Sequence, residues 1–141
     1  MNGRFFLDTN VFVYSLDPGS RAKAARATEL IRRAVGSGKG SISFQVVQEF
    51  FNVALRRFAQ PMTPVEAEEY LLTVFRPLLA VQSSQGLYAE ALRLFGSHRL
   101  SWCDALIVAA AVQGKCEVLY SEDLQHGRRF EGLRIENPFL S

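Results

Sequence analysis

Two aspartates follow short apolar segments that are typical of buried strands. Asp8 directly follows Phe5-Phe6-Leu7, and Asp123 comes three residues after Val118–Tyr120. In a parallel sheet the carboxyl ends of the strands form one edge, and ligands bind there near the switch in strand order. The positions therefore predict that both carboxylates face one site. Each acid also has a local alternative, because Asp8 could cap the following helix and Asp123 could be a solvated turn residue.

Two further acids could reach the same place from helices. Asp104 is the only charged residue between Arg99 and Lys115, so it needs backbone donors, a cation or water as partners on an apolar helix. Its local alternative is a helix cap, because Ser101 and Asp104 have capping-box spacing. Glu49 belongs to a stripe of polar residues at helical spacing, which either lines a cleft or faces solvent. The stripe consists of Gln45, Gln48, Glu49, Asn52 and Arg56.

Carboxylates that meet in one pocket repel each other, and some take up protons unless a cation neutralises them. Hard oxygen ligands suit Mg²⁺, which Mn²⁺ can replace. Mg²⁺ keeps coordination positions open for phosphate oxygens and supports in-line displacement at phosphorus. The pattern predicts a metal-dependent site for phosphate chemistry. Its predicted catalytic and metal-binding residues are Asp8, Glu49, Asp104 and Asp123.

The composition favours a nucleic acid as the partner of such a site. Of the 16 basic residues, 13 are arginines, and the planar guanidinium matches phosphate. The formal net charge is +2, and without the four acids the rest of the chain has 16 basic against 10 acidic residues. An acidic site in an arginine-rich body would hold a metal and the nucleic-acid backbone together.

Length and composition exclude several other classes of protein. The 141 residues, 48% of them hydrophobic, fit one folded domain spanning residues 1–141 rather than a disordered chain. Cys103 and Cys116 lie among apolar residues, which predicts buried reduced thiols and no disulfide scaffold. The longest apolar run, Ala105–Val112, is far below the ~20 residues of a membrane span. With no signal peptide before Asp8, we expect a soluble cytoplasmic protein.

Short apolar segments alternate with amphipathic ones along the chain. This alternation predicts an α/β fold, a three-layer sandwich in which helices cover both faces of a short four- to five-stranded parallel sheet. The predicted strands are Arg4–Leu7, Ser41–Phe44, Leu78–Val81, Val118–Tyr120 and a candidate fifth at Leu133–Ile135. The predicted helices are Asn10–Leu16, Ser20–Val35, Gln45–Phe58, Pro64–Phe75, Ser84–Phe95 and Ser101–Val112, with a turn at Asp17-Pro18-Gly19. The loop Gly36-Ser37-Gly38-Lys39-Gly40 lacks the first glycine and the Ser or Thr of a P-loop.

These motifs resemble those of the PIN-domain ribonucleases. The resemblance covers the whole chain and rests on Phe-Leu-Asp8-Thr9-Asn10, a helical Glu49, Trp102–Ile107 and Leu119–Leu124. The length resembles that of the VapC branch, the toxins of toxin–antitoxin pairs. The resemblance implies an endoribonuclease that uses Mg²⁺ or Mn²⁺ to cleave RNA, forms a homodimer, and is inhibited by a cognate antitoxin. The helix Pro64–Phe75 is the candidate dimer surface.

The resemblance also assigns residues one by one. It places the four acids at the family's acidic positions, and Thr9, Asn10 and Ser121 at small polar positions that would bond ligands or water. Glu122 fills a variable position of the last motif, and its role is left open. The family uses no catalytic histidine, so His98 and His126 are predicted to lie outside the site.

Two other classes of function are compatible with aspartates at strand ends. A Mg²⁺-dependent phosphotransfer or phosphatase domain is the first, although Asn10 stands where the haloacid-type signature has its second aspartate. A non-catalytic RNA-binding or partner-binding module with the same fold is the second. The intact set of four acids counts against that module, because binding alone does not need them.

Overall fold

A computed structural model describes residues 2–17 and 19–140 and has a six-stranded sheet at its centre. The strand order is β3-β2-β1-β4-β6-β5, and every neighbouring pair is parallel except β5 and β6. The strands are β1 (Phe5–Leu7), β2 (Gly40–Ser43), β3 (Leu79–Val81), β4 (Val118–Tyr120), β5 (Arg129–Phe130) and β6 (Leu133–Glu136). The sheet thus has one strand more than the largest number predicted, which was five. The missed strand, β5, has two residues and no periodic pattern, and it pairs through a tight turn at Glu131.

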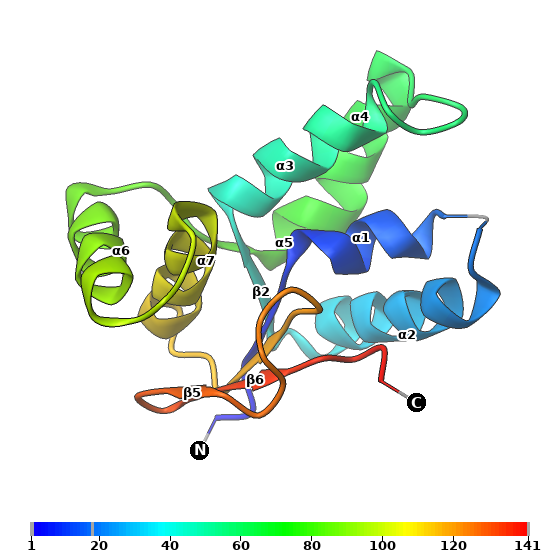
Figure 1. Cartoon of the computed structure of the whole chain (residues 1–141). Coiled ribbons are helices and arrows are strands. Elements are labelled where there is room, and N and C mark those ends of the chain that lie inside the picture. The colour runs from blue at the N-terminus through cyan, green and yellow to red at the C-terminus, as the bar shows by residue number, and fades with distance from the viewer. Residues whose placement is uncertain (1, 18, 141) are drawn as a thin grey trace.

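Helices lie on both sides of the strands, so the predicted three-layer α/β arrangement is confirmed. Figure 1 shows α6 and α7 on one side of the sheet and α1 and α2 on the other. The helical segments are α1 (Thr9–Ser15), α2 (Arg21–Ser37), α3 (Phe44–Ala54), α4 (Pro64–Tyr70), the π-helical η1 (Leu71–Phe75), α5 (Arg76–Leu78), α6 (Gln85–Ser97) and α7 (Trp102–Gln113). In the described ranges, none of these helices has the length and hydropathy to cross a membrane.

An aromatic cluster fixes α3 against the segment that follows it. Phe50 of α3 stacks on Tyr70 with ring centres 4.9 Å apart, and Phe75 meets it edge-on at 5.2 Å. Such aromatic contacts each contribute roughly 1 kcal/mol beyond the burial of the rings. Because Glu49 precedes Phe50 in the same helix, this packing also sets the position of the Glu49 carboxylate.

Two helix ends differ from the predicted ones by three residues or more, and the other boundaries agree to within two residues. The helix predicted to reach Phe58 ends at Ala54, because the chain folds back and the Met62 N–H donates to the Ala54 carbonyl over 2.9 Å. The helix that begins at Pro64 continues through a π-helical turn to Leu78 instead of ending at Phe75. Of the predicted turn at residues 17–19, residue 18 lies outside the described residues, and the Gly19 N–H donates to the Asp17 side chain.

Because α2 lies close to β2, we expect a methyl group added at Gly40 to have a strong effect on the free energy of unfolding. A Cβ atom at Gly40 would stand 2.7 Å from the Ala34 Cα, so we expect Gly40→Ala to lower the free energy of unfolding by about 1–3 kcal/mol. A Cβ atom at Gly36 meets nothing within 4 Å. We therefore expect Gly36→Ala, inside α2, to raise the free energy of unfolding by ~0.5–1 kcal/mol. Urea denaturation of both variants tests this, and equal effects would contradict it.

Candidate active site

The carboxyl ends of β1 and β4 form the edge that carries the predicted acids. The two strands are parallel neighbours, with Leu7 opposite Tyr120. From β1 the chain proceeds outward to β2 and β3, whereas β4 and β6 lie on the other side. The switch in strand order is therefore between β1 and β4, where open parallel sheets bind ligands. Asp8 directly follows β1, and Ser121 directly follows β4.

The Asp8 carboxylate is buried and is held by two hydrogen-bond donors. Asp8 is 6% exposed, the Thr9 backbone N–H donates to it over 2.7 Å, and the Ser121 hydroxyl donates over 2.8 Å. Burial raises the pKa of Asp8 from 3.8 to about 6, although both hydrogen bonds lower it. The charges of Glu49 and Asp123 raise this pKa further. Asp8 thus caps α1 and also presents a carboxylate whose ionised form needs a cation.

Glu49 reaches the same place from α3. The Thr9 hydroxyl donates to Glu49 Oε1 over 2.6 Å, and the Gln45 amide donates to Glu49 Oε2 over 3.1 Å. The same amide donates to the Cys103 carbonyl over 3.2 Å. These bonds join α1, α3 and α7. Of the polar stripe, Glu49 therefore faces the cavity, and Gln45 is buried behind it.

Asp104 and Asp123 complete the acidic lining of one cavity. Asp104 lies in the first turn of α7, where its N–H donates to the Ser101 hydroxyl over 3.1 Å. The Asn10 amide donates to Asp123 over 3.3 Å, and burial followed by the charge of Asp104 raises the pKa of Asp123. All four predicted acids line this cavity of about 420 Å³. The lining consists of Asp8, Thr9, Asn10, Val13, Glu49, Val53, Arg57, Cys103, Asp104, Ile107 and Asp123.

The cavity offers the donors that a hard divalent cation prefers, although the acids are spread over its walls. Within residues 2–17 and 19–140, no three His, Cys, Asp or Glu side chains are close enough to hold one ion directly. Mg²⁺ commonly binds through one or two carboxylates and keeps several waters, so separated carboxylates fit it. The charge of the buried Asp8 carboxyl is destabilised by desolvation and by neighbouring acids, and a cation in the cavity would offset that cost.

Glu122 points away from this cavity although it is adjacent to Asp123. Its carboxylate accepts a hydrogen bond from the Tyr14 hydroxyl and pairs with Lys23 Nζ at 2.8 Å. Both contacts tie the end of β4 to α1 and α2, so its role is a link between these elements.

Both histidines have contacts outside the cavity lining. The His98 ring packs against Phe130 with centres 5.1 Å apart. The His126 Nδ1 atom accepts the Asn137 N–H over 3.0 Å. Neither residue is among those that line the cavity, in agreement with the prediction.

Arg57 lines the cavity but is not among the predicted site residues. Glu49, Val53 and Arg57 follow one another at four-residue intervals, and this helical spacing is the signal that could have marked Arg57. Although α3 ends at Ala54, the Arg57 N–H still donates to the Val53 carbonyl over 2.7 Å, so Arg57 stays beside Glu49 and Val53 in the cavity lining. A guanidinium at that position is suited to bind a phosphate that approaches the acids.

The two cysteines differ in exposure. Cys116 is buried, as predicted, but Cys103 is exposed, so the prediction of a buried thiol is wrong there. Cys103 lies in the first turn of α7, ahead of the buried part of that helix. Both are free thiols.

The raised pKa of Asp8 predicts how stability depends on pH. Between about pH 4 and 6 the folded chain keeps a proton that the unfolded chain has released, so its stability falls as the pH rises. In EDTA we expect the free energy of unfolding to drop by on the order of 2–3 kcal/mol over this interval, relative to Asp8→Asn. Thermal unfolding of both proteins across this range measures the difference. A difference that does not change with pH would contradict the prediction.

By its fold and site the protein is an α/β domain with a cavity lined by carboxylates at the switch point of its sheet. The model of the PIN domain family matches residues 5–130. The chain therefore belongs to the PIN domain family. No curated protein matches the chain at a significant level.

Solved structures with the same fold come from toxin–antitoxin systems. VapC20 of Mycobacterium tuberculosis, described as a sarcin–ricin loop cleaving toxin, has a TM-score of 0.62 and 17% identity over 84% of this chain and 89% of its own. A toxin–antitoxin complex from Klebsiella pneumoniae has a TM-score of 0.64 and 18% identity, covering 94% and 96%. VapBC2 from Rickettsia felis, bound to a promoter DNA fragment, has a TM-score of 0.64 and 17% identity, also covering 94% and 96%. At these identities the similarity establishes the fold alone.

Proposed function

We propose that the protein is a metal-dependent endoribonuclease and the toxin of a type II toxin–antitoxin pair. The observation that carries the proposal is the convergence of four carboxylates from four separate segments on one cavity. Family membership and the toxins among the solved structures support the choice of RNA as substrate. The arginine-rich composition supports it as well.

The proposed site has two sets of residues. The acids would bind the cation, and hydrogen-bond donors orient the acids. When bound, Mg²⁺ or Mn²⁺ would supply an activated water and neutralise charge on the scissile phosphate. The Ser121 hydroxyl and the Thr9 N–H orient Asp8, and the Thr9 hydroxyl orients Glu49. Of Asp8, Glu49, Asp104 and Asp123, one or two would bind the ion directly, and the others would bind it through its coordinated waters.

Two side chains at the cavity act on the substrate or near it. Arg57, exposed in the turn after α3, binds a phosphate next to the cleavage site. Asn10 donates to Asp123 and orients that carboxylate.

A groove next to the cavity is the proposed binding site of the antitoxin. It has a volume of about 760 Å³ and shares Val13, Val53 and Arg57 with the acidic cavity. A segment of the antitoxin bound there would block access to the acids. The proposed homodimer surface is the exposed side of α4 and η1, where Val65 and Leu72 are 78% and 43% exposed.

The deciding experiment is incubation of the purified protein with a mixture of RNAs, with Mg²⁺, with Mn²⁺ or with EDTA. We expect cleavage with either ion, none in EDTA, and defined ends when the fragments are mapped. Full-length RNA under all three conditions would refute the proposal. Transfer of a phosphoryl group to the protein from a donor, seen by mass, would favour the phosphotransfer alternative.

A further inference from the structure

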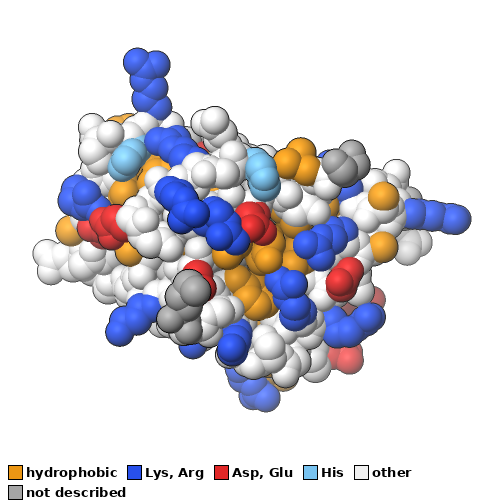
Figure 2. Space-filling view, turned by 90° about the horizontal axis from the view of Figure 1, so that it is seen from below, with side chains coloured by type: hydrophobic (Ala, Val, Ile, Leu, Met, Phe, Trp, Pro, Cys, Tyr) orange, Lys and Arg blue, Asp and Glu red, His pale blue; other side chains and the backbone are white. Residues whose placement is uncertain are grey.

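A second pocket lies at the opposite edge of the sheet, at the amino ends of the strands. It has a volume of about 270 Å³ and combines residues from the start of β1, the end of α2 and the start of β4. Figure 2 shows the molecule from below, where many Lys and Arg and a few Asp and Glu side chains surround a group of apolar ones. The lining consists of Gly3, Arg4, Phe5, Arg33, Ser37, Lys39, Glu117, Val118 and Tyr120.

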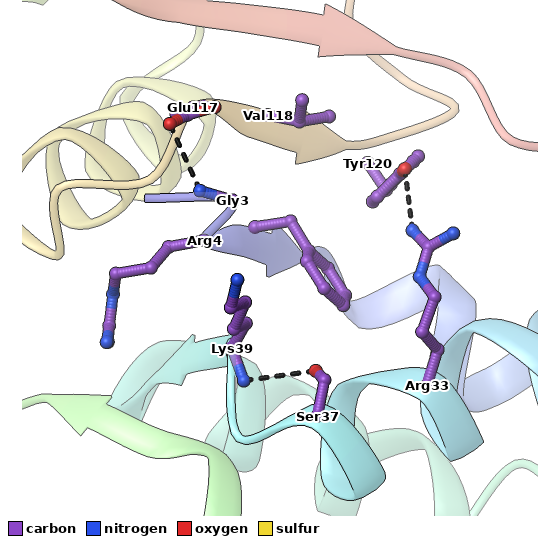
Figure 3. Close-up of a pocket in the computed structure, with 9 residues that line it drawn as sticks. Gly3, Arg4, Arg33, Ser37, Lys39, Glu117, Val118 and Tyr120 are labelled. Atoms are coloured by element: carbon purple, nitrogen blue, oxygen red, sulfur yellow. Dashed lines mark hydrogen bonds between the residues drawn. The ribbon is translucent and has the colours of Figure 1, made fainter. Parts of the chain in front are cut away.

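Arg33 is held in place over an aromatic floor. Its guanidinium lies 4.8 Å from the centre of the Phe5 ring and 5.6 Å from that of Tyr120. The Arg33 Nη2 atom donates to the Tyr120 hydroxyl over 2.8 Å, a bond drawn in Figure 3. A guanidinium has five N–H donors, so most of them are left to bind a ligand. An arginine oriented in this way loses little side-chain entropy when it binds a phosphate.

The pocket has an excess of positive charge. In the part of the chain that the structure describes, Arg4, Arg33 and Lys39 form no ion pair. The one acid in the lining, Glu117, accepts hydrogen bonds from the backbone N–H groups of Asn2 and Gly3. The bond from Gly3 is the main reason why the pKa of Glu117 is lowered. Three cations against one carboxylate that already has its own donors favour an anion in the pocket.

A second arginine, Arg26, follows along α2, where it also pairs with Glu29 at 3.9 Å and donates to the Pro138 carbonyl. Arg26 and Arg33 are seven residues apart, which places them on one face of the helix about 10 Å from each other. The short strand β1 separates Arg4 from Asp8, and an extended chain spans about 13 Å between them. One RNA strand can therefore reach both edges, and repeated phosphates match a row of separated cations.

We propose that the pocket of Arg4, Arg33 and Lys39 over Phe5 and Tyr120 is a second phosphate-binding site, which holds the RNA strand at a distance from the acidic cavity. The inference rests on the proposed ribonuclease function and extends it. Arg33 and Lys39 bind the phosphate, and Arg4, whose guanidinium donates to the Gly114 carbonyl and the Ser41 hydroxyl, contributes only its charge. The site increases affinity for long RNA and takes no part in the chemistry.

The test compares two neighbouring arginines in an inactive background. Fluorescent single-stranded RNA is titrated by anisotropy at several salt concentrations into Asp8→Asn protein carrying Arg33→Gln or Arg32→Gln. Arg32 is the matched control, because it is exposed, loses the same charge and lines a different surface with Ala24 and Thr28. We expect Arg33→Gln to weaken binding about tenfold and to lower the salt slope by about one. Arg32→Gln should change binding less than about twofold.

A second variant separates the position of the guanidinium from its charge. Tyr120→Phe removes the hydroxyl that orients Arg33 but keeps every charge, so it should weaken binding about threefold with the salt slope unchanged. With Asp8 restored, Arg33→Gln should raise KM for long RNA and leave both kcat and the KM of short RNA unchanged.

Each outcome bears on one of the two proposals. Equal affinities and salt slopes for Arg33→Gln and Arg32→Gln would overturn the second site, and so would an equal effect on short and long RNA. If the variants differ in binding while the unmodified protein cleaves no RNA, the phosphate-binding site stands and the ribonuclease proposal fails.

Discussion

Replacing Asp8 by asparagine should lower kcat/KM for RNA cleavage by on the order of 10³-fold or more. Asp8 is the most buried of the four acids and follows the strand next to the switch point. Removing its charge removes the strongest reason for a cation to enter the cavity. The fold should survive, because an asparagine oxygen can still accept from the Thr9 N–H and the Ser121 hydroxyl can still bond the side chain.

Kinetics of cleavage and thermal unfolding of the same Asp8→Asn preparation separate chemistry from stability. We expect the melting temperature in EDTA at pH 7 to rise, since a buried charge has been removed. The control is Glu122→Gln, which removes an acid beside Asp123 that pairs with Lys23 outside the cavity. Its activity should stay within a few-fold of the unmodified protein. A folded Asp8→Asn protein that still cleaves RNA at the normal rate would remove Asp8 from the proposed site.

The second prediction with a large expected effect concerns the affinity of the acidic cavity for a divalent metal ion. We expect Asp104→Asn and Glu49→Gln each to weaken Mn²⁺ binding by at least about tenfold, because each removes one charge from a shared cavity. The charge of Asp104 also raises the pKa of Asp123, as expected for carboxylates that line one cavity. Calorimetric titration with Mn²⁺ measures the dissociation constants without any RNA.

The matched control for the Mn²⁺ titration is Asp17→Asn. Asp17 lines the neighbouring groove and not the acidic cavity, so its loss should leave Mn²⁺ affinity almost unchanged. If all three variants bound Mn²⁺ equally well, the ion would be bound elsewhere. If only Asp17→Asn were impaired, the neighbouring groove would be the metal site.

The local patterns of the sequence were sufficient to predict most helices and strands and to select the four acids that line the cavity. Strands such as Val118–Tyr120 are runs of apolar residues, and helix starts such as Ser101 are marked by capping residues. Both signals are properties of neighbouring residues, so they need no knowledge of the fold. That Asp8 and Asp123 belong to one edge followed from the alternation of strands and helices alone, because parallel strands end on the same side.

Other features depend on contacts between distant segments, and only the tertiary structure decided them. The end of α3 at Ala54 comes with a hydrogen bond from the Met62 N–H, at a point where the helical pattern of the sequence continues. Glu122 and Asp123 are adjacent, yet Lys23 draws the first away from the acids. The direction of a side chain depends on partners that can be about a hundred residues away in the chain. The residues next to it in the sequence do not identify these partners.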